Sequence, residues 1–231
     1  MADWLRRLLE TGAELFGPDA AVRVIAIRTM VVSGTATLLA VAIGVPLGYA
    51  LARTMFRGRL VVLGFVNTAM GMPPVVVGLI VWLLLVRSGP FGGLDLIYTK
   101  RAMVLAQCLI ATPIVVGFTA AAMQALPPRL PDLLAVLGAG PVRTMWLLAR
   151  EARLGLLVAV MAAFGGIVSE VGASMIVGGN LERSTRVLTT AIVTETSRGE
   201  VERALALGIL LLALSFAVNL ALTIVQQRHR P

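Results

Sequence analysis

Charged and chemically reactive side chains are scarce in this sequence of 231 residues. Asp, Glu, Lys and Arg make up 14% of the chain, against about 25% in an ordinary soluble domain. Cys108 is the only cysteine and His229 the only histidine. These counts exclude a disulfide framework and a Cys/His zinc site within one chain. We therefore predict no metal site, and no catalytic residue is evident.

Lysine is also nearly absent, since Lys100 stands alone against nineteen arginines. A P-loop needs a lysine directly after glycine, whereas Lys100 follows Tyr98 and Thr99. We expect this chain to bind no cofactor itself. The formal net charge is +8, but the arginines are scattered between apolar blocks. That distribution predicts membrane lipid as a partner and no nucleic acid.

Apolar residues are abundant, at 58% of the chain with a mean hydropathy of +0.91. They form five long blocks, in which Glu170 is the only charged residue: 29–52, 60–86, 102–125, 154–177 and 204–225. About 20 apolar residues in a helix span a hydrocarbon core, and a helix satisfies its own backbone groups there. The sequence predicts an all-α integral membrane protein with about five transmembrane helices.

The first 28 residues have a different pattern. Apolar side chains recur there at helical spacing, opposite charged ones: Trp4, Leu5, Leu8, Leu9 and Phe16. This pattern is typical of a helix that lies in the membrane interface. We therefore divide the chain into an N-terminal interfacial segment at 1–28, a transmembrane domain at 29–225 and a tail at 226–231.

Acidic residues are distributed unevenly between the two sides of the membrane, whereas basic residues are not. Five spans put the two chain ends on opposite sides. The side that holds 53–59, 126–153 and the C-terminus carries nine basic and two acidic residues, and the other side carries eleven basic and nine acidic. Membrane topology depends mainly on the basic residues, and their similar numbers on the two sides leave the orientation open. The acidic residues weakly favour a cytoplasmic C-terminus.

Glycine and proline interrupt several of the blocks. Gly44 and Gly48 stand at i and i+4, which permits close helix approach. Pro73 and Pro74 remove two backbone donors in the middle of the second block. Two interpretations stay open: ordinary packing of membrane helices, or helices that bend during gating.

Glu170 lies in the fourth block, within the run Ser169-Glu170-Val171-Gly172. A charge in a span costs about 2.5–3.5 kcal/mol on insertion scales, so we expect this carboxylate to face protein or water. No other span supplies an acidic partner for a proton relay. We favour a structural or pathway-lining role over proton transfer.

The loop at 126–153 predicts a short helix between two turns. Pro131 and Asp132 suit its first turn, Gly138 can close it in the left-handed conformation, and Pro141 suits the start of another helix. Its apolar stripe consists of Leu133, Leu134 and Leu137. This stripe must pack either against the chain's own loop or into a groove on a soluble partner.

The segment at 181–202 predicts another helix outside the bilayer. Ser184 or Thr185 can cap it, it would run through Leu188 to Glu195, and Gly199 lies beyond its end. Three arginines in the segment could attract a dianion, or could simply be solvated: Arg183, Arg186 and Arg198.

The 126–153 loop resembles the coupling loop of ABC importer membrane subunits. Their pattern is Glu-Ala-Ala, three residues, Gly, nine residues, then Ile-x-Leu-Pro. Aligned on Gly138, this chain has Asp132-Leu133-Leu134 in place of Glu-Ala-Ala and Arg150-Glu151 in place of Leu-Pro. The resemblance implies a coupling helix that docks on an ATPase subunit, made by Asp132, Leu133, Leu134, Leu137, Gly138, Ala139 and Gly140.

Other segments resemble the oxyanion branch of these importers. The run 169–173 is similar to a Gly-Glu-Phe/Val-Gly-Ala segment of the molybdate, sulfate and tungstate permeases, and 150–153, 177–180 and 185–192 are most similar to tungstate permeases. The resemblance implies a type I ABC importer permease fold. From the interruptions and the charges described above, we take Pro73, Pro74, Ser169, Glu170, Gly172 and Arg186 as pathway or gate candidates.

The partners and the location follow from the same resemblance. It implies a homodimer of this permease, an ATPase subunit dimer that uses ATP and Mg, and an extracytoplasmic oxyanion-binding protein. The location would be the bacterial inner membrane, with the N-terminus outside and the C-terminus cytoplasmic. Two alternatives remain: a permease for molybdate, sulfate, methionine or another small solute, and a membrane channel or enzyme outside the ABC class.

Overall fold

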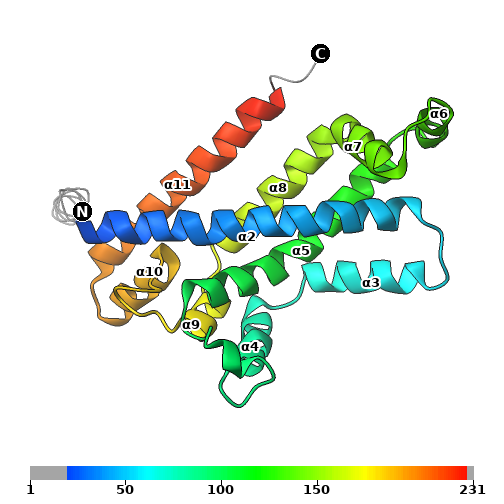
Figure 1. Ribbon diagram of the computed structural model, residues 1–231. Helices are drawn as coiled ribbons and strands as arrows, with labels where there is room; N and C mark the ends of the chain where they lie inside the picture. The colour runs from blue at the N-terminus through cyan, green and yellow to red at the C-terminus, as the bar shows by residue number, and fades with distance from the viewer. Residues whose placement is uncertain (1–19, 228–231) are drawn as a thin grey trace.

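The computed structural model describes residues 20–227, and within that range the chain is helical with no β-strand. The elements are α2 (Ala20–Arg53), α3 (Arg59–Met70), α4 (Pro74–Leu85), the 3-10 helix η1 (Gly92–Leu94), α5 (Lys100–Gln124), α6 (Leu130–Val136), α7 (Pro141–Glu151), α8 (Arg153–Val168), α9 (Gly172–Gly178), α10 (Leu188–Ser197) and α11 (Val201–Gln227). Figure 1 shows α2, α5 and α11 as the long rods of the molecule. The predicted all-α class is confirmed.

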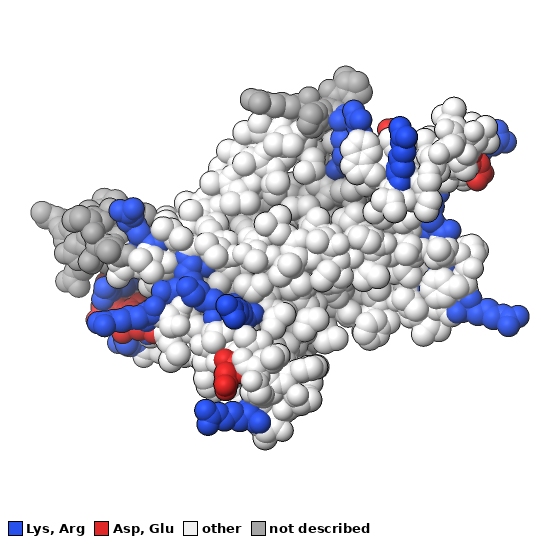
Figure 2. Space-filling model, viewed as in Figure 1, with Lys and Arg blue, Asp and Glu red and all other residues white. Residues whose placement is uncertain are grey.

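Three helices are long and apolar enough to cross a membrane, namely α2, α5 and α11. The number rises to five if each of two bent pairs, α3 with α4 and α7 with α8, forms one span. In Figure 2 the arginine and lysine side chains gather toward the two ends of the molecule's long axis, with a broad uncharged area between them. This arrangement is what an apolar membrane interior requires.

The first predicted block lies within a longer helix. α2 begins at Ala20, so residues 20–28 continue directly into the apolar stretch. The rest of the predicted interfacial helix lies outside the described residues. At the other end of the chain α11 extends to Gln227, and the last four residues of the predicted tail are likewise outside the described range.

The second and fourth blocks are broken helices. The second bends by 102° between α3 and α4, at the predicted Pro73-Pro74 interruption. Gly64 of α3 and Gly78 of α4, on either side of this bend, therefore do not share one helix face. The prediction of one continuous span for the fourth block is also wrong, because α8 ends at Val168 and α9 starts at Gly172.

Helix α5 is the centre of the packing, with α2, α3, α4, α8 and α9 against it. The predicted close approach at Gly44 and Gly48 is confirmed. A Cβ atom on Gly44 would lie 2.7 Å from Val115 Cγ1, and one on Gly48 would lie 2.7 Å from the Val116 carbonyl oxygen. The two axes can approach this closely because neither glycine has a side chain.

We predict that Gly48→Ala destabilises the protein while Gly34→Ala does not. The new methyl group at position 48 would meet backbone and Thr119 within 2.7 Å, whereas nothing lies within 4 Å of a Cβ at position 34 on the same helix. Overpacking of this kind costs about 1–3 kcal/mol, and about 2–4 °C of melting temperature is lost per kcal/mol in chains of this size. Thermal unfolding of the detergent-purified variants measures the difference, and equal midpoints would contradict it.

Candidate functional site

Helix α6 has the ends that the sequence predicts. Pro131 stands in its first turn, and Gly138 follows the C-cap residue Leu137 with φ of +78°. The Gly138 N–H donates to the Ala135 carbonyl and the Ala139 N–H donates to the Leu134 carbonyl, both at 2.9 Å. This pair of bonds is a Schellman motif, which closes a helix through a left-handed glycine.

The apolar stripe of α6 divides between two environments. Leu134 is partly buried and packs against the cluster of Met123, Leu148 and Ala152. Leu133 is 59% exposed and Leu137 is 80% exposed, and their neighbour Val136 is 86% exposed. Leu134 therefore packs against the chain's own helices, whereas Leu133 and Leu137 face outward, so docking on a soluble partner stays a prediction for these two side chains.

These outward side chains lie at one extremity of the molecule. Figure 1 shows α6 at the end where α2 stops, beyond the ends of α5 and α7. Asp132 is exposed on the same short helix, as are Gly138 and Gly140, while Ala139 is half-buried. The predicted coupling residues thus form one small surface with an apolar centre and an acidic edge.

The break between α8 and α9 contains Ser169 and Glu170. Glu170 Oε1 accepts a hydrogen bond from the Ala173 N–H at 3.1 Å, so the carboxylate satisfies the first turn of α9. The Glu170 carbonyl accepts from Thr189 Oγ1 at 3.1 Å, which joins the break to α10. The exposed Ser169 Oγ donates back to the Gly165 carbonyl. A structural role for Glu170 follows from these bonds.

The two helix breaks face each other. A Cβ atom on Gly172 would collide with the side chain of Val75, directly after Pro74, and one on Gly78 would lie 2.6 Å from the Cα atom of Ala173. Pro74 opens α4, and Pro73 stands before it in an extended conformation. The structure therefore brings together the predicted pathway residues at 73–74 and 169–172, through the packing of α4 on α9.

The guanidinium of Arg186 is paired and is not a free cation. Its side chain is 11% exposed, and its Nη1 atom lies 3.2 Å from Oε1 of Glu182. Arg198 similarly pairs with Glu195 at 3.3 Å. Neutralisation by these carboxylates reduces the field that the predicted arginine group would direct at a dianion.

The capping residue of α10 differs from the prediction. α10 begins at Leu188 after Val187, and Thr190 Oγ1 accepts from the Val187 N–H at 3.0 Å. Thr185 instead turns inward, where its hydroxyl donates to the Gly178 carbonyl and accepts from the Leu181 N–H. The expected left-handed residue after the helix is confirmed at Gly199, with φ of +82°.

Sequence reasoning missed two buried polar residues that hold these segments. The guanidinium of Arg28 donates to the carbonyls of Arg186 at 2.8 Å and Arg183 at 3.0 Å. Gln107, in the middle of α5, donates from Nε2 to the Ile167 carbonyl and to Ser174 Oγ, each at 3.3 Å. Each stands out in the sequence as a strongly polar residue within or beside an apolar block.

The described residues contain no group of three or more His, Cys, Asp or Glu side chains that could hold a metal ion. Their long apolar helices, the two interrupted ones and the exposed short helix at one extremity are the features of a multi-pass membrane protein. The family model for the inner membrane component of binding-protein-dependent transport systems matches residues 44–231, and the chain belongs to that family.

Individual proteins show the same relationship. The chain is 42% identical to a probable anion ABC transporter permease of Haloferax volcanii, over 83% of this chain and 84% of that one. It is 37% identical to the tungstate uptake system permease TupB of Peptoclostridium acidaminophilum, over 90% and 92% of the two chains. These are ABC transporter permeases, so the class predicted from the coupling loop and the 169–192 region is confirmed.

A solved structure agrees in fold. A bacterial alginate ABC transporter, crystallised with its alginate-bound periplasmic protein, matches with a TM-score of 0.75 at 16% identity, over 99% of this chain and 88% of that one. The predicted type I importer permease fold is confirmed. At this identity the likeness concerns the fold alone.

We predict that Gly138→Ala loosens the end of α6 and that Gly140→Ala does not. A left-handed conformation costs a residue with a Cβ atom about 1–2 kcal/mol, which corresponds to roughly five- to thirtyfold faster exchange of the Ala139 amide hydrogen. Gly140 has φ of −68° and open space around it, so alanine fits there without strain. Hydrogen exchange read by mass spectrometry tests this, and unchanged protection in Gly138→Ala would contradict it.

Proposed function

We propose that this chain is the membrane-spanning subunit of an ATP-driven importer of an oxyanion, and that its cargo is tungstate. One observation carries the coupling half of the proposal. Helix α6 holds Leu133 and Leu137 outward at an extremity of the molecule, while Leu134 fixes the helix to the cluster below it. An exposed apolar surface of this kind is suited to a groove on a soluble partner.

The partner in this proposal is an ATPase subunit, one on each of two copies of the permease. ATP and Mg are bound by the ATPase, and this chain transmits its movement. Leu134 packs with Met123 at the end of α5 and with Leu148 of α7, so displacement of α6 displaces the central helix of the fold. The α4–α9 junction at Pro74 and Gly172 lies further along the same assembly and would form the gate.

The orientation follows from the ATPase. If α6 faces the cytoplasm, α2 begins on the outer side, and the C-terminal end of α11 is cytoplasmic. The inner membrane of a bacterium is the expected location. A binding protein would deliver the oxyanion to the outer side, as the alginate transporter is crystallised with its periplasmic protein. The segment from Leu181 to Arg198, with Arg183 exposed on it, is the proposed receiving surface.

The cargo assignment is supported by the tungstate permeases among the relatives, at 37% identity over 90% of this chain and 36% over 67%. Molybdenum permeases are also related, at 28% identity over 84% for the one from Azotobacter vinelandii. The described residues of this chain contain no dense cationic cage, and specificity would reside in the binding protein. Molybdate is therefore the second candidate cargo.

We predict that the double variant Leu133→Asp, Leu137→Asp uncouples transport. Burial of an exposed leucine in a partner groove contributes about 1.5–3 kcal/mol, and a carboxylate in its place opposes docking. Uptake by the reconstituted complex should fall at least tenfold, while the thermal midpoint of the permease alone stays unchanged because both side chains are exposed. Leu94→Asp, at an exposed leucine in η1, is the matched control. Wild-type uptake by the double variant would refute the coupling role.

We predict that removal of this permease from its host lowers cellular tungsten more than cellular molybdenum. Elemental analysis of cells grown with both oxyanions at equal low concentration measures the two contents, and restoration of the wild-type chain should recover the tungsten. Selective loss of molybdenum would instead support the second cargo. Unchanged contents of both would exclude tungstate and molybdate as the cargo.

A further inference from the structure

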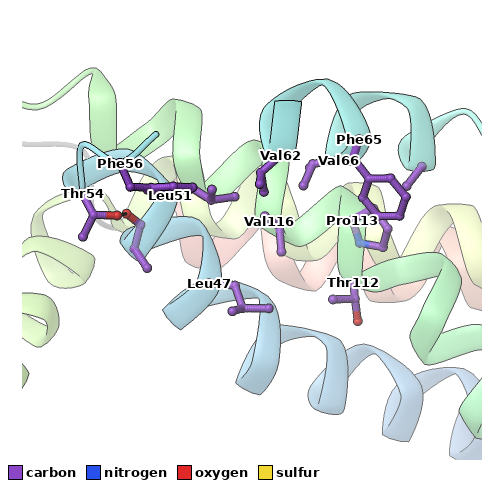
Figure 3. A pocket seen from close by; sticks show the side chains of 12 residues that line it. Leu47, Leu51, Thr54, Phe56, Val62, Phe65, Val66, Thr112, Pro113 and Val116 are labelled. Carbon is purple, nitrogen blue, oxygen red and sulfur yellow. Dashed lines mark hydrogen bonds between the residues drawn. The ribbon is translucent and has the colours of Figure 1, made fainter. Parts of the chain in front are cut away.

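An apolar pocket opens between the C-terminal end of α2, helix α3 and the middle of α5 (Figure 3). Its volume is about 360 Å³. Leu51, Val66 and Val116, one from each helix, form the buried cluster at its base. Figure 3 shows Phe56 and Phe65 on the α2–α3 side and Pro113 on α5. The pocket is within the usual size range of small-molecule sites, about 300–1,000 Å³.

The two threonine hydroxyl groups that line the pocket already donate hydrogen bonds to backbone carbonyls. Thr54 Oγ1 donates to the Ala50 carbonyl at 2.5 Å, and Thr112 Oγ1 donates to the Cys108 carbonyl at 2.7 Å. Each bond joins the threonine to the carbonyl four residues earlier in the chain. An oxyanion in this pocket would lose its hydration without gaining a charged partner, which is strongly unfavourable. The chemistry of the walls therefore selects an apolar occupant.

The α2–α3 connection contributes Thr54 and Phe56 to the pocket lining, so it forms the rim, and it carries positive charge. The connection 53–59 contains three arginines and no acidic residue. Arg53 Nη2 donates to the Met123 carbonyl and Arg59 Nε donates to the Leu51 carbonyl, so these two bonds hold the ends of the three helices together. Arg57 is exposed, and among residues 20–227 neither Arg57 nor Arg59 forms an ion pair with a carboxylate.

The apolar side chains of the same connection are also exposed. Met55 is 88% exposed and Leu60 is 80% exposed, on either side of Arg57. An apolar surface next to unpaired cations is the pattern of a segment at the level of lipid headgroups. Figure 1 places this connection at the end of the molecule where α6 lies, the side that the proposed function assigns to the cytoplasm. Anionic lipids are concentrated in that leaflet.

We propose that the pocket between α2, α3 and α5 binds one anionic phospholipid, with an acyl chain against Leu51, Val66 and Val116 and the phosphate at Arg57 and Arg59. The charge of the rim and the apolar walls together match a ligand that is anionic at one end and hydrocarbon at the other. The site is distinct from the α6 surface and from the α4–α9 junction.

Native mass spectrometry of the purified full-length protein tests this site. The protein is incubated with equal amounts of phosphatidylglycerol and phosphatidylcholine, and retained lipids are counted. We expect one tightly retained phosphatidylglycerol per chain, which excess inorganic phosphate does not displace. Ala69 lines the pocket, so Ala69→Phe fills it and should reduce retention at least tenfold. Leu109→Phe, at an exposed leucine of α5 outside the pocket, should have no effect.

The charge of the rim is tested separately. The double variant Arg57→Gln, Arg59→Gln should still bind lipid but lose about fivefold of its preference for phosphatidylglycerol per arginine. Arg101→Gln, at the other end of α5, should keep the wild-type preference. If Ala69→Phe does not fold, Ala50→Leu fills the pocket from α2.

Three outcomes would overturn the lipid site. One is equal retention of the two lipids by the wild-type protein. Another is wild-type retention in the variants that fill the pocket. The third is conversion of a dimer to a monomer by Ala69→Phe with lipid retention unchanged, which would show that a second copy of the chain occupies the pocket. None of these results depends on transport, so the site can fail while the proposed function stands.

Discussion

Satisfaction of backbone polar groups at two helix breaks is the constraint on which the arrangement of this chain depends. In an apolar surrounding each unpaired N–H or C=O group costs several kcal/mol, by order of magnitude. Three hydrogen bonds satisfy the backbone groups that the break after Val168 leaves without helical partners. Gln107 donates to the Ile167 carbonyl. The Glu170 carboxylate accepts from the Ala173 N–H, and Thr189 donates to the Glu170 carbonyl. The break at Pro73 needs fewer partners because proline has no N–H to satisfy.

These bonds also explain why the two breaks meet. A helix that turns at 169–171 presents the small residues Gly172 and Ala173, and α4 packs on them through Val75 and Gly78. Larger side chains at these glycines would separate α4 from α9. The polar groups therefore set the direction of each segment, and the small residues set their distance.

Much of this arrangement could be predicted from the sequence, because its causes are local. Proline and glycine at 131, 138 and 141 define the ends of α6 through their own backbone preferences, and the double proline marks the bend of the second block. The interruption of the fourth block could not be predicted in the same way. Residues 154–177 contain no proline, and their break depends on Gln107, about 60 residues earlier in the chain.

In the candidate site, too, some features follow from the local sequence and others depend on tertiary contacts. The left-handed Gly138 follows from the loop sequence, whereas the division of the α6 stripe into an inward Leu134 and outward Leu133 and Leu137 depends on Met123 and Leu148 in other helices. Arg186 likewise has a suitable charge in the sequence, but its pairing with Glu182 appears only when the segment is folded. Local chemistry indicated where the surfaces lie, and tertiary contacts determine which side chains they present.

The hydrogen bonds of Arg28 restrict the residues that can replace it near the start of α2. Its two terminal nitrogens reach the carbonyls of Arg183 and Arg186, and a third carbonyl, that of Glu182, lies 3.4 Å from Nη1. A guanidinium can serve several acceptors at once because its donors are spread over a rigid plane. Lysine has the same charge but concentrates its donors on one nitrogen. Retention of positive charge alone would therefore not preserve the connection between α2 and the segment 182–186, and this position should tolerate no conservative exchange.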